Sequence, residues 1–407
     1  MSRLRRTTLI VGISLFLWGC GSNSLRTASV LPTTPSLQAS RNPAEPSHYR
    51  VVYSFKDRVS SARVRPDGAE PVSGLIEDAA GNLYGTTVVG GTGYGTVFKI
   101  DPNGNETVLH AFNGKDGSLP FGGLIIDPDG NLYGTTNGGG SAGFGVVFKI
   151  DTSGQETTLH NFIQSDGANP LSALTRDLRG NLYGTTYAGG PKNYGLAFKI
   201  DRSGVFTVIH NFDGTDGISP HSPLLLVSGR LYGTTFGGGS LGGGVVFTMD
   251  LSGNETVLYN FGQRVRASGR FPADALVRDQ VGNLYGTTEG GGDRSCRNGC
   301  GVVYKLDTNG NETVLHKFIG LDGLSGRGLI KDAGGNLYGT TVAGGRYDLG
   351  VLYTLSPTGA FRVRYNFGST NGALPLSSLV RDSKRNLFGT TSTGGQYGRG
   401  VVFEFTP

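Results

Sequence analysis

The stretch GNLYGTT at residues 81–87 decides the fold, because seven versions of it occur along the chain. They occupy residues 81–87, 130–136, 180–186, 229–235, 282–288, 335–341 and 385–391, with GRLYGTT as the fourth copy and RNLFGTT as the seventh. Successive copies start 49, 50, 49, 53, 53 and 50 residues apart. A period of this length is typical of a propeller, a solenoid or another repeat array.

Each period holds four short strand patterns. In the second period, runs rich in apolar and β-branched residues occupy 122–127, 131–136, 146–151 and 156–162. Gly, Asp, Asn and Ser separate these runs, as they do in turns between strands. Four strands in about 50 residues make one blade of a β-propeller.

The two ends of the repeat region complement each other. The chain finishes with GVVFEFTP at residues 400–407, a third strand with no fourth after it, and YRVVYSF at residues 49–55 matches a fourth strand with no first three before it. We therefore predict an all-β fold, a seven-bladed β-propeller with four antiparallel strands per blade. The N-terminal strand is expected to complete the last blade and close the ring, which removes exposed sheet edges.

Residues 1–20 have the pattern of an export signal. The basic start MSRLRR precedes an apolar run of about ten residues, which is too short to span a bilayer. The following LWGC resembles the lipobox of bacterial lipoproteins, in which Cys20 carries the lipid; a plain secretory signal with a chance cysteine is the alternative. Residues 21–48, rich in Ser, Thr and Pro, predict a disordered tether. Residues 49–407 then form the propeller.

These features predict a location and exclude some partners. We expect a bacterial envelope protein, lipid-anchored at the outer membrane, or an extracellular one, with membrane contact through the lipid only. The net charge of +5 falls to +2 once the three arginines of the signal are removed. No Lys/Arg run interleaved with aromatic residues is present, so nucleic acid is not an expected partner. A monomer is expected.

The repeated GNLYGTT, the diglycine loop, VFKID and ETVLHNF together resemble the GloVer tandem-repeat proteins, a bacterial group with variable surface anchors. The resemblance covers residues 49–407 and implies the fold and a surface location, but no activity. More loosely, the pattern D-x-x-G-N-L-Y-G-T is similar to blades of two-component-sensor propellers. Kelch repeats share the period and a diglycine, but the one tryptophan of this chain, Trp18, lies outside the repeats.

Four histidines are the first candidates for chemistry. They share one position of the fourth strand: His110, His160, His210 and His316. A metal site needs ligands within about 2 Å of one ion, whereas copies of one position diverge around a ring. A packing role is therefore expected, with no metal and no cofactor. The chain has no HExxH, P-loop, GxSxG or CxxC pattern, so no catalytic residue is predicted.

The candidate ligand site consists of residues that differ in type from the equivalent residues of the other repeats. Asp274 and Arg327 replace small residues near the start of first strands, and Glu289 is the one charge directly after a TT pair. Two lengthened loops, at 262–273 and 289–301, adjoin the same blade, and the second carries Arg294 and Arg297. We predict a ligand site at this rim for an anionic or hydroxyl-rich ligand. Under the alternative interpretation, Asp274 pairs with Arg327 and the loops are evolutionary drift.

Cys296 and Cys300 are the cysteines of the predicted domain, and an exported chain favours a disulfide between them. Symmetry-breaking charges on one face favour a binding module for a glycan or a protein. Two alternatives remain open: a carbohydrate-active enzyme with a site in the central depression, because propeller sites assemble from distant residues, and a purely structural envelope protein.

Overall fold

The computed structural model describes residues 48–56, 65–262, 268–272 and 274–407. The chain divides into two units, residues 1–48 and 49–407. Cys20, the signal and the tether up to residue 47 lie outside the described residues. No helix in the described part is long and apolar enough to cross a membrane.

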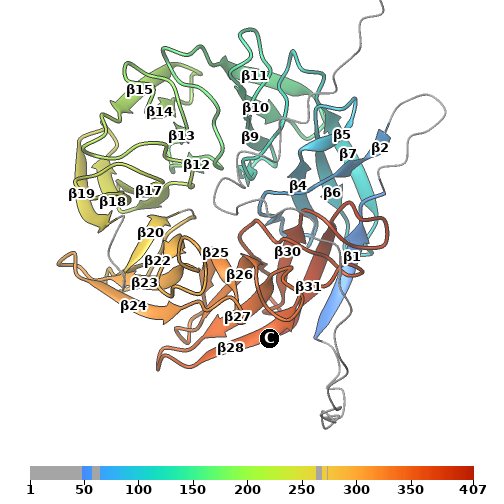
Figure 1. Ribbon diagram of the computed structural model, residues 1–407. Helices are drawn as coiled ribbons and strands as arrows, with labels where there is room; N and C mark the ends of the chain where they lie inside the picture. The colour runs from blue at the N-terminus through green and yellow to red at the C-terminus, as the bar shows by residue number, and fades with distance from the viewer. Residues whose placement is uncertain (1–47, 57–64, 263–267, 273) are drawn as a thin grey trace, which may run out of the picture. The chain divides into compact units, whose positions relative to one another are not determined.

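Unit 49–407 consists of seven antiparallel sheets arranged as the blades of a propeller (Figure 1). Blade 1 contains β3 (Ile76–Glu77), β4 (Leu83–Thr87), β6 (Thr96–Ile100) and β7 (Glu106–Ala111). Blade 2 contains β8 (Ile125–Ile126), β9 (Leu132–Thr136), β10 (Val146–Ile150) and β11 (Glu156–Asn161). Blade 3 contains β12 (Thr175–Arg176), β13 (Leu182–Thr186), β14 (Leu196–Ile200) and β15 (Phe206–Asn211). Blade 4 contains β16 (Leu225–Val227), β17 (Arg230–Thr235), β18 (Gly242–Asp250) and β19 (Glu255–Gly262).

The remaining blades follow the same order. Blade 5 contains β21 (Val277–Arg278), β22 (Leu284–Gly291), β23 (Val302–Leu306) and β24 (Glu312–Lys317). Blade 6 contains β25 (Leu324–Lys331), β26 (Leu337–Ala343), β27 (Val351–Leu355) and β28 (Phe361–Asn366). Blade 7 contains β29 (Val380–Arg381), β30 (Leu387–Thr391), β31 (Val401–Phe405) and β1 (Tyr49–Ser54). The all-β, seven-bladed propeller predicted from the sequence is confirmed.

Strand β1 lies beside the last strand of the chain. It pairs antiparallel with β31, in the register Tyr49↔Phe405 and Val51↔Phe403. Blade 7 is therefore built from both ends of the domain. Three strands stand outside the four-per-blade pattern: β2 (Arg65–Ala69) and β5 (Val89–Gly91) form a two-stranded ribbon, and β20 (Gly269–Pro272) adds to β22.

The glycine of LYGTT is required because an aromatic ring of the third strand lies directly against it. A Cβ atom added to Gly85 would lie 2.6 Å from Cζ of Phe98. The corresponding approach is 2.4–2.6 Å in all seven copies, which is closer than real Cβ contacts allow. Any side chain here would separate the second strand from the third. The repeated motif is therefore a packing requirement of each blade.

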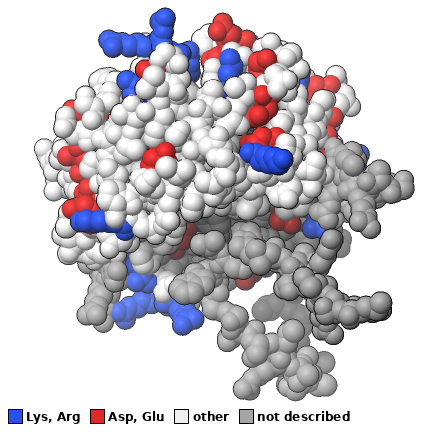
Figure 2. Space-filling view, turned by 90° about the horizontal axis from the view of Figure 1, so that it is seen from above, with Lys and Arg blue, Asp and Glu red and all other residues white. Residues whose placement is uncertain are grey.

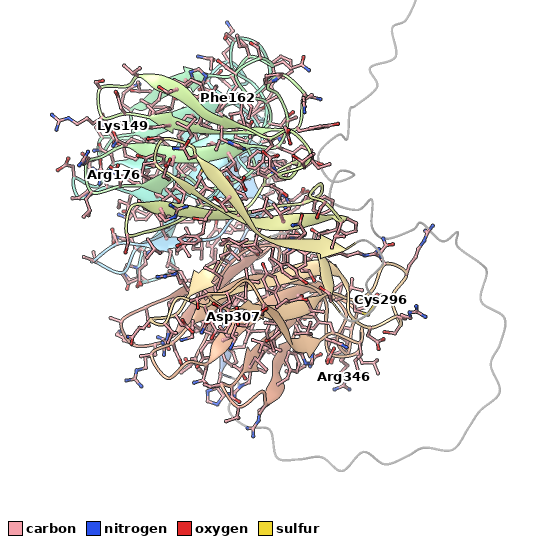
Figure 3. The ribbon with its side chains drawn as sticks, turned by 90° about the vertical axis from the view of Figure 1, so that its left-hand side faces the viewer. Lys149, Phe162, Arg176, Cys296, Asp307 and Arg346 are labelled. Atoms are coloured by element: carbon pink, nitrogen blue, oxygen red, sulfur yellow. A yellow bond between two sulfur atoms is a disulfide. The ribbon has the colours of Figure 1, made fainter. Side chains whose placement is uncertain are left out.

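Aromatic pairs hold neighbouring blades together. The Phe at the end of each fourth strand meets the third-strand ring of the next blade edge to face, as Phe112 meets Phe148 with centroids 5.1 Å apart. All seven such pairs have centroid distances of 5.1–5.4 Å, including Phe55 with Phe98. Phe162, which pairs with Phe198, lies among the strands in Figure 3. Pairs of this geometry contribute about 0.5–1.5 kcal/mol each beyond burial.

The Asp-x-x-Gly-Asn turns close the first hairpin of most blades. Oδ1 of Asp78 accepts hydrogen bonds from the backbone N–H groups of Ala80 and Asn82, both at 2.9 Å. Oδ2 of Asp78 accepts from Tyr84 Oη at 2.9 Å. The tyrosine of LYGTT therefore fixes the turn as well as filling space. Gly81 adopts a φ of 81°, which glycine reaches without steric cost.

Candidate functional site

One face of the ring carries paired loops, and we call it the loop face. On this face the loop that enters each first strand meets the loop between the second and third strands, through isolated bridges such as Ser118↔Gly138 and Ala168↔Ala188. In blade 5 the pairing lengthens into β20 and β22, with Arg270↔Gly290 in register. Arg270 Nε also donates to the carbonyl of Asn298 at 3.0 Å. The two lengthened loops of the sequence therefore lie side by side on the loop face.

Arg327 and Glu289 form an ion pair between blades 5 and 6. Nη2 of Arg327, on β25, donates to Oε1 of Glu289, on β22. The two side chains are 7% and 22% exposed. A guanidinium this buried requires a paired carboxylate, because an unpaired charge would lose its hydration without compensation. The partner of Arg327 is therefore Glu289, and not Asp274 as the alternative interpretation of the sequence assumed.

Asp274 ties three blades together where their first strands begin. Its Oδ2 accepts a hydrogen bond from the backbone N–H of Gly328, and its Oδ1 accepts from Ser378 Oγ at 3.3 Å and from Ala275 N at 2.8 Å. The residue is buried. Both carboxylate oxygens of Asp274 therefore accept hydrogen bonds from blades 5, 6 and 7. Asp274 holds these blades together and is not free to bind a ligand.

A row of aromatic side chains runs across blades 3 to 5 on the loop face. Tyr187, His221, Phe236 and Phe271 follow one another with ring centroids 6.4, 5.4 and 5.0 Å apart. Each of the four is half-buried. We call them the aromatic row. Tyr187 and Phe236 directly follow the TT pair of their blades, where other copies have Val88, Asn137, Val342 and Ser392.

His221 joins the aromatic row to the charged residues. Burial lowers the pKa of His221, the negative charge of Glu289 opposes that effect, and the positive charge of Arg327 adds to it. The imidazole is therefore neutral at pH 7. Its Nδ1 lies 3.3 Å from the carbonyl oxygen of Ser219. A carbonyl can only accept, so Nδ1 carries the proton and Nε2 remains as an acceptor.

This cluster, the aromatic row with Glu289 and Arg327, combines ring faces with directional polar groups. Aromatic faces bind apolar ring surfaces of a ligand, and a few convergent polar groups fix its orientation. The set contains one cationic donor, one anionic acceptor and one neutral imidazole acceptor. It suits a ligand that carries both C–H surfaces and hydroxyl groups.

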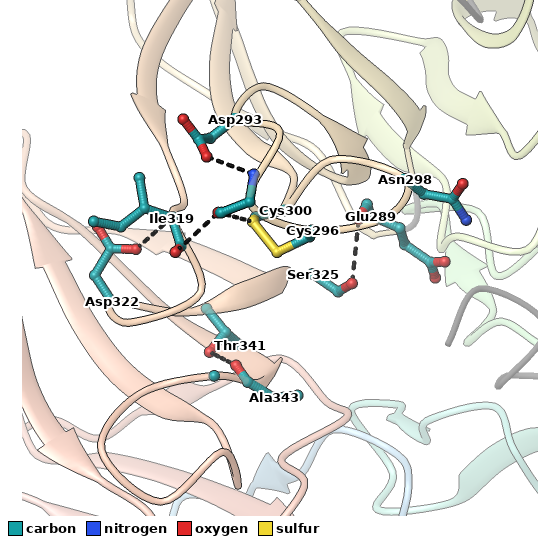
Figure 4. The surroundings of a disulfide bond; sticks show 12 residues. Glu289, Asp293, Cys296, Asn298, Cys300, Ile319, Asp322, Ser325, Thr341 and Ala343 are labelled. Carbon is teal, nitrogen blue, oxygen red and sulfur yellow. Dashed lines mark hydrogen bonds between the residues drawn. A yellow bond between two sulfur atoms is a disulfide. The ribbon is translucent and has the colours of Figure 1, made fainter. Parts of the chain in front are cut away.

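The disulfide lies in the loop between β22 and β23. Cys296 and Cys300 are bonded, with Cα atoms 5.2 Å apart (Figure 4). Cys300 N donates to Asp293 O, and Ser325 Oγ donates to the carbonyl of Glu289 at 3.2 Å (Figure 4). The carbonyl of Cys300 also accepts from the backbone N–H of Ser325 at 2.9 Å, so the end of the loop is fastened to β25 of blade 6. Figure 3 shows Cys296 on a loop at the side of the domain.

The predicted loop arginines do not join the cluster. Arg294 and Arg297 are exposed, and neither forms a hydrogen bond or ion pair with another described residue. Arg264 and Arg266, on the other lengthened loop, lie outside the described residues. Figure 2 shows charges of both signs scattered over one side of the molecule. Of the residues predicted from the sequence, the structure brings together Asp274, Glu289 and Arg327.

Sequence reasoning missed His221 and Phe271. A signal for His221 was present: it follows a Pro at the start of the first strand, where most other copies have an apolar residue such as Val72, Phe121, Leu171 or Leu376. The repeat-breaking positions of Asp274 and Arg327 lie one residue further along each copy, where blade 4 has the ordinary Ser222. Phe271 precedes the equivalent Pro of blade 5 and has no comparable signal, because this position varies freely among the copies.

The fold and the symmetry-broken loop face define a repeat protein of the β-propeller class. The sequence model of the Gloeobacter/Verrucomicrobia repeat matches residues 42–180, 157–318 and 293–407. The chain belongs to this repeat family, as the repeated motif implied. Among curated proteins, none matches the sequence.

Solved structures share the fold at low identity. Virginiamycin B lyase from Staphylococcus aureus matches with a TM-score of 0.59 and 12% identity, over 88% of this chain and 100% of that one. The extracellular domain of the putative hybrid two-component system BT3049 from B. thetaiotaomicron matches with a TM-score of 0.56 and 16% identity, over 89% of this chain and 41% of that one. At these identities the likeness establishes the propeller architecture alone.

Proposed function

We propose that this protein is a binding module that takes a hydroxyl-rich ligand, such as an envelope or extracellular glycan, on its loop face. The observation that carries the proposal is the cluster formed by the aromatic row with Glu289 and Arg327. His221 and Arg327 stand where most other blades have apolar or small residues, and Tyr187, Phe236 and Glu289 stand where the other blades have Val, Asn or Ser. A purely structural ring gains nothing from concentrating these replacements at one place, so the cluster supports binding. A protein ligand is the alternative occupant.

A location follows from the same proposal. Cys20 would anchor the chain by its lipid, and residues 21–48 would hold the propeller away from the membrane. The protein would then present its loop face to ligands of the envelope or its surroundings. The disulfide Cys296–Cys300 is consistent with an oxidising compartment.

The repeat supplies fold-compatible variants for the test. His221→Leu and Phe236→Val introduce residues that the equivalent positions of other blades already hold, Leu171 and Val88. A panel of neutral and acidic glycans is first screened with the purified protein. Each variant should then weaken the binding of any glycan found in the screen at least about tenfold. A tenfold loss corresponds to about 1.4 kcal/mol of binding free energy. The melting temperature should stay close to that of the wild type.

Matched controls separate the cluster from the rest of the loop face. Tyr347→Ala removes an exposed aromatic side chain of blade 6 outside the cluster and should leave affinity unchanged. Charge reversal of Arg294 and Arg297 tests whether the disulfide loop contributes to the site. A hit whose affinity survives both His221→Leu and Phe236→Val would refute the proposed site.

A second candidate is a carbohydrate-active enzyme that uses the same cluster. It is favoured by the neutral His221, whose pKa is influenced by the charges of Glu289 and Arg327 and whose Nε2 could take a proton from a bound substrate. Release of reducing ends or unsaturated products from the glycan panel, abolished by His221→Leu, would distinguish this function from binding alone.

A further inference from the structure

The seven junctions between neighbouring blades repeat one arrangement of three side chains. A His or Tyr on the fourth strand contacts an Asp, Asn or Ser in the loop that follows, and the first residue of the next fourth strand lies against them. The seven sets are Tyr53–Asp67–Glu106, His110–Asp116–Glu156, His160–Asp166–Phe206, His210–Asp216–Glu255, Tyr259–Ser268–Glu312, His316–Asp322–Phe361 and Tyr365–Asn371–Tyr49.

In three junctions the third side chain is aromatic and serves packing. Phe206 stacks on His160 and Phe361 stacks on His316, each with centroids 3.7 Å apart. Tyr49 stacks on Tyr365 at 3.8 Å. These junctions fit the packing role that the sequence suggested for the histidines. They also show that the fold accepts an aromatic residue at this position.

The junction of blades 3 and 4 has a different composition. Nε2 of His210, on β15, lies 2.9 Å from Oδ2 of Asp216, and one ligand atom from each of His210, Asp216 and Glu255 lies within 4.8 Å of the others. Oε1 of Glu255, on β19, is buried and accepts no hydrogen bond from the described residues. An imidazole and two carboxylates thus converge from two blades, with one carboxylate oxygen lacking a partner.

The other glutamate junctions lack one part of this set. Glu156 accepts a hydrogen bond from Thr158 Oγ1 at 3.0 Å, whereas Val257 occupies that place beside Glu255. Glu312 accepts from Tyr259 and Ser268, and Glu106 faces a tyrosine rather than an imidazole. Among the described residues, the junction of blades 3 and 4 therefore combines an imidazole and two carboxylates with a Glu oxygen, Oε1 of Glu255, that has no hydrogen-bond partner.

The charges at this junction favour a cation. Asp216 and Glu255 place two carboxyl groups beside the one imidazole of His210. Among the described residues, neither Asp216 nor Glu255 forms an ion pair with a lysine or arginine, and Lys192 pairs instead with Asp213 at 3.5 Å. The side chains of His210 and Asp216 are 18% and 17% exposed, so an ion and water can reach them.

We propose that His210, Asp216 and Glu255 form a site for a divalent transition-metal ion such as Zn²⁺. Imidazole nitrogen and carboxylate oxygen are ordinary ligands of Zn²⁺ at about 2.0–2.2 Å, and three protein ligands leave a position for water. Two ligands at that range from one tetrahedral ion lie about 3.4 Å apart. The three groups therefore need only small side-chain movements to surround an ion. Because the ligands come from blades 3 and 4, the bound ion joins the two blades.

The test is a Zn²⁺ titration of the full-length, tag-free protein by calorimetry after EDTA treatment and dialysis. Co²⁺ is used in parallel as a probe, because its visible absorption reports the ligand geometry. The variants are Glu255→Phe, which copies the residue of two other junctions, and His210→Tyr, which copies Tyr259. Glu156→Phe is the matched control at the junction of blades 1 and 2.

We expect one Zn²⁺ per chain, lost or weakened at least about tenfold in both variants and kept in Glu156→Phe. Zn²⁺ should also raise the melting temperature of the wild type but not of Glu255→Phe. Absence of stoichiometric binding by the wild type would overturn the proposal. So would equal binding by His210→Tyr, which remains decisive if Glu255→Phe fails to fold. Loss of binding in Glu156→Phe alone would place the ion at another junction.

Discussion

At the scale of single residues, two tyrosine hydroxyl groups stand out in the core. Tyr304 and Tyr353 occupy the third-strand position that holds Phe98, Phe148 or Phe198 in other blades. Their rings pack as the phenylalanines do, but both hydroxyl groups are buried without a hydrogen-bond partner among the described residues. A buried hydroxyl without a partner costs about 1–3 kcal/mol of stability. The hydroxyl groups of Tyr304 and Tyr353 therefore destabilise the fold, and the repeat does not require them because other blades have Phe at this position.

Tyr304→Phe should accordingly stabilise the protein by about 1 kcal/mol or more. The ring and its edge-to-face contact with Phe261 remain, while the unsatisfied hydroxyl is removed. Urea unfolding of wild type and variant measures the difference. The converse change, Phe98→Tyr, is the control and should destabilise. A Tyr304→Phe variant less stable than the wild type would mean that the hydroxyl has a partner after all.

At the scale of strands and their junctions, a glutamate at the junction of blades 7 and 1 makes stability depend on pH. Burial, and then the charge of Asp67, raise the pKa of Glu106 to about 8, against an ordinary value of 4.5. The folded protein thus keeps this proton over a range in which the unfolded chain has lost it. The resulting stabilisation is complete below about pH 4.5 and is lost as pH rises toward 8.

Glu106→Gln should remove this dependence, because the amide resembles the protonated carboxyl. The melting temperature of the variant should match that of the wild type at pH 4–5 and exceed it at pH 8–9. Differential scanning calorimetry across this range measures both melting temperatures. Other ionisable groups are the same in the two proteins, so their effects cancel when one melting temperature is subtracted from the other. A constant difference at all pH values would show that Glu106 is ionised in the folded state.

The sequence predicts the elements better than their contacts. The period of about 50 residues and the four apolar runs suffice to predict seven blades, because backbone and packing demands such as Gly85 against Phe98 recur in each copy. The ribbon of β2 and β5 and the added strand β20 extend the loop pairing that other blades make through isolated bridges, and the spacing of the repeat does not predict that extension. The Arg327–Glu289 pair depends on how two loops of different length pack, which spacing alone does not reveal.

At the scale of the whole domain, the ring depends on its N-terminal strand. A chain that starts at residue 57 lacks β1 and Phe55, and exposes the edge of β31. Tyr49 and Phe55 are both buried, and burying two such rings contributes roughly 3–6 kcal/mol. The truncated protein should aggregate or melt well below the full-length protein in thermal denaturation. Equal melting would mean that blade 7 is stable with three strands.

The proposed anchor is tested at the same scale. Cys20→Ser should abolish incorporation of a fatty-acid probe in bacteria and leave the chain unprocessed or released from the membrane fraction. Labelling with a palmitate analogue, followed by fractionation, measures both effects. Unchanged membrane attachment in this variant would contradict lipidation at Cys20.

Hydrogen–deuterium exchange with a bound glycan hit tests the central claim most directly, because it locates the ligand without a variant. We predict slower exchange on the loop face, at residues 186–189, 219–222, 235–238, 288–291 and 324–328. The Asp-x-x-Gly-Asn turns at 78–82 and 127–131, at the opposite ends of the strands, should be unchanged. Protection of these turns in place of the loop face would contradict the account.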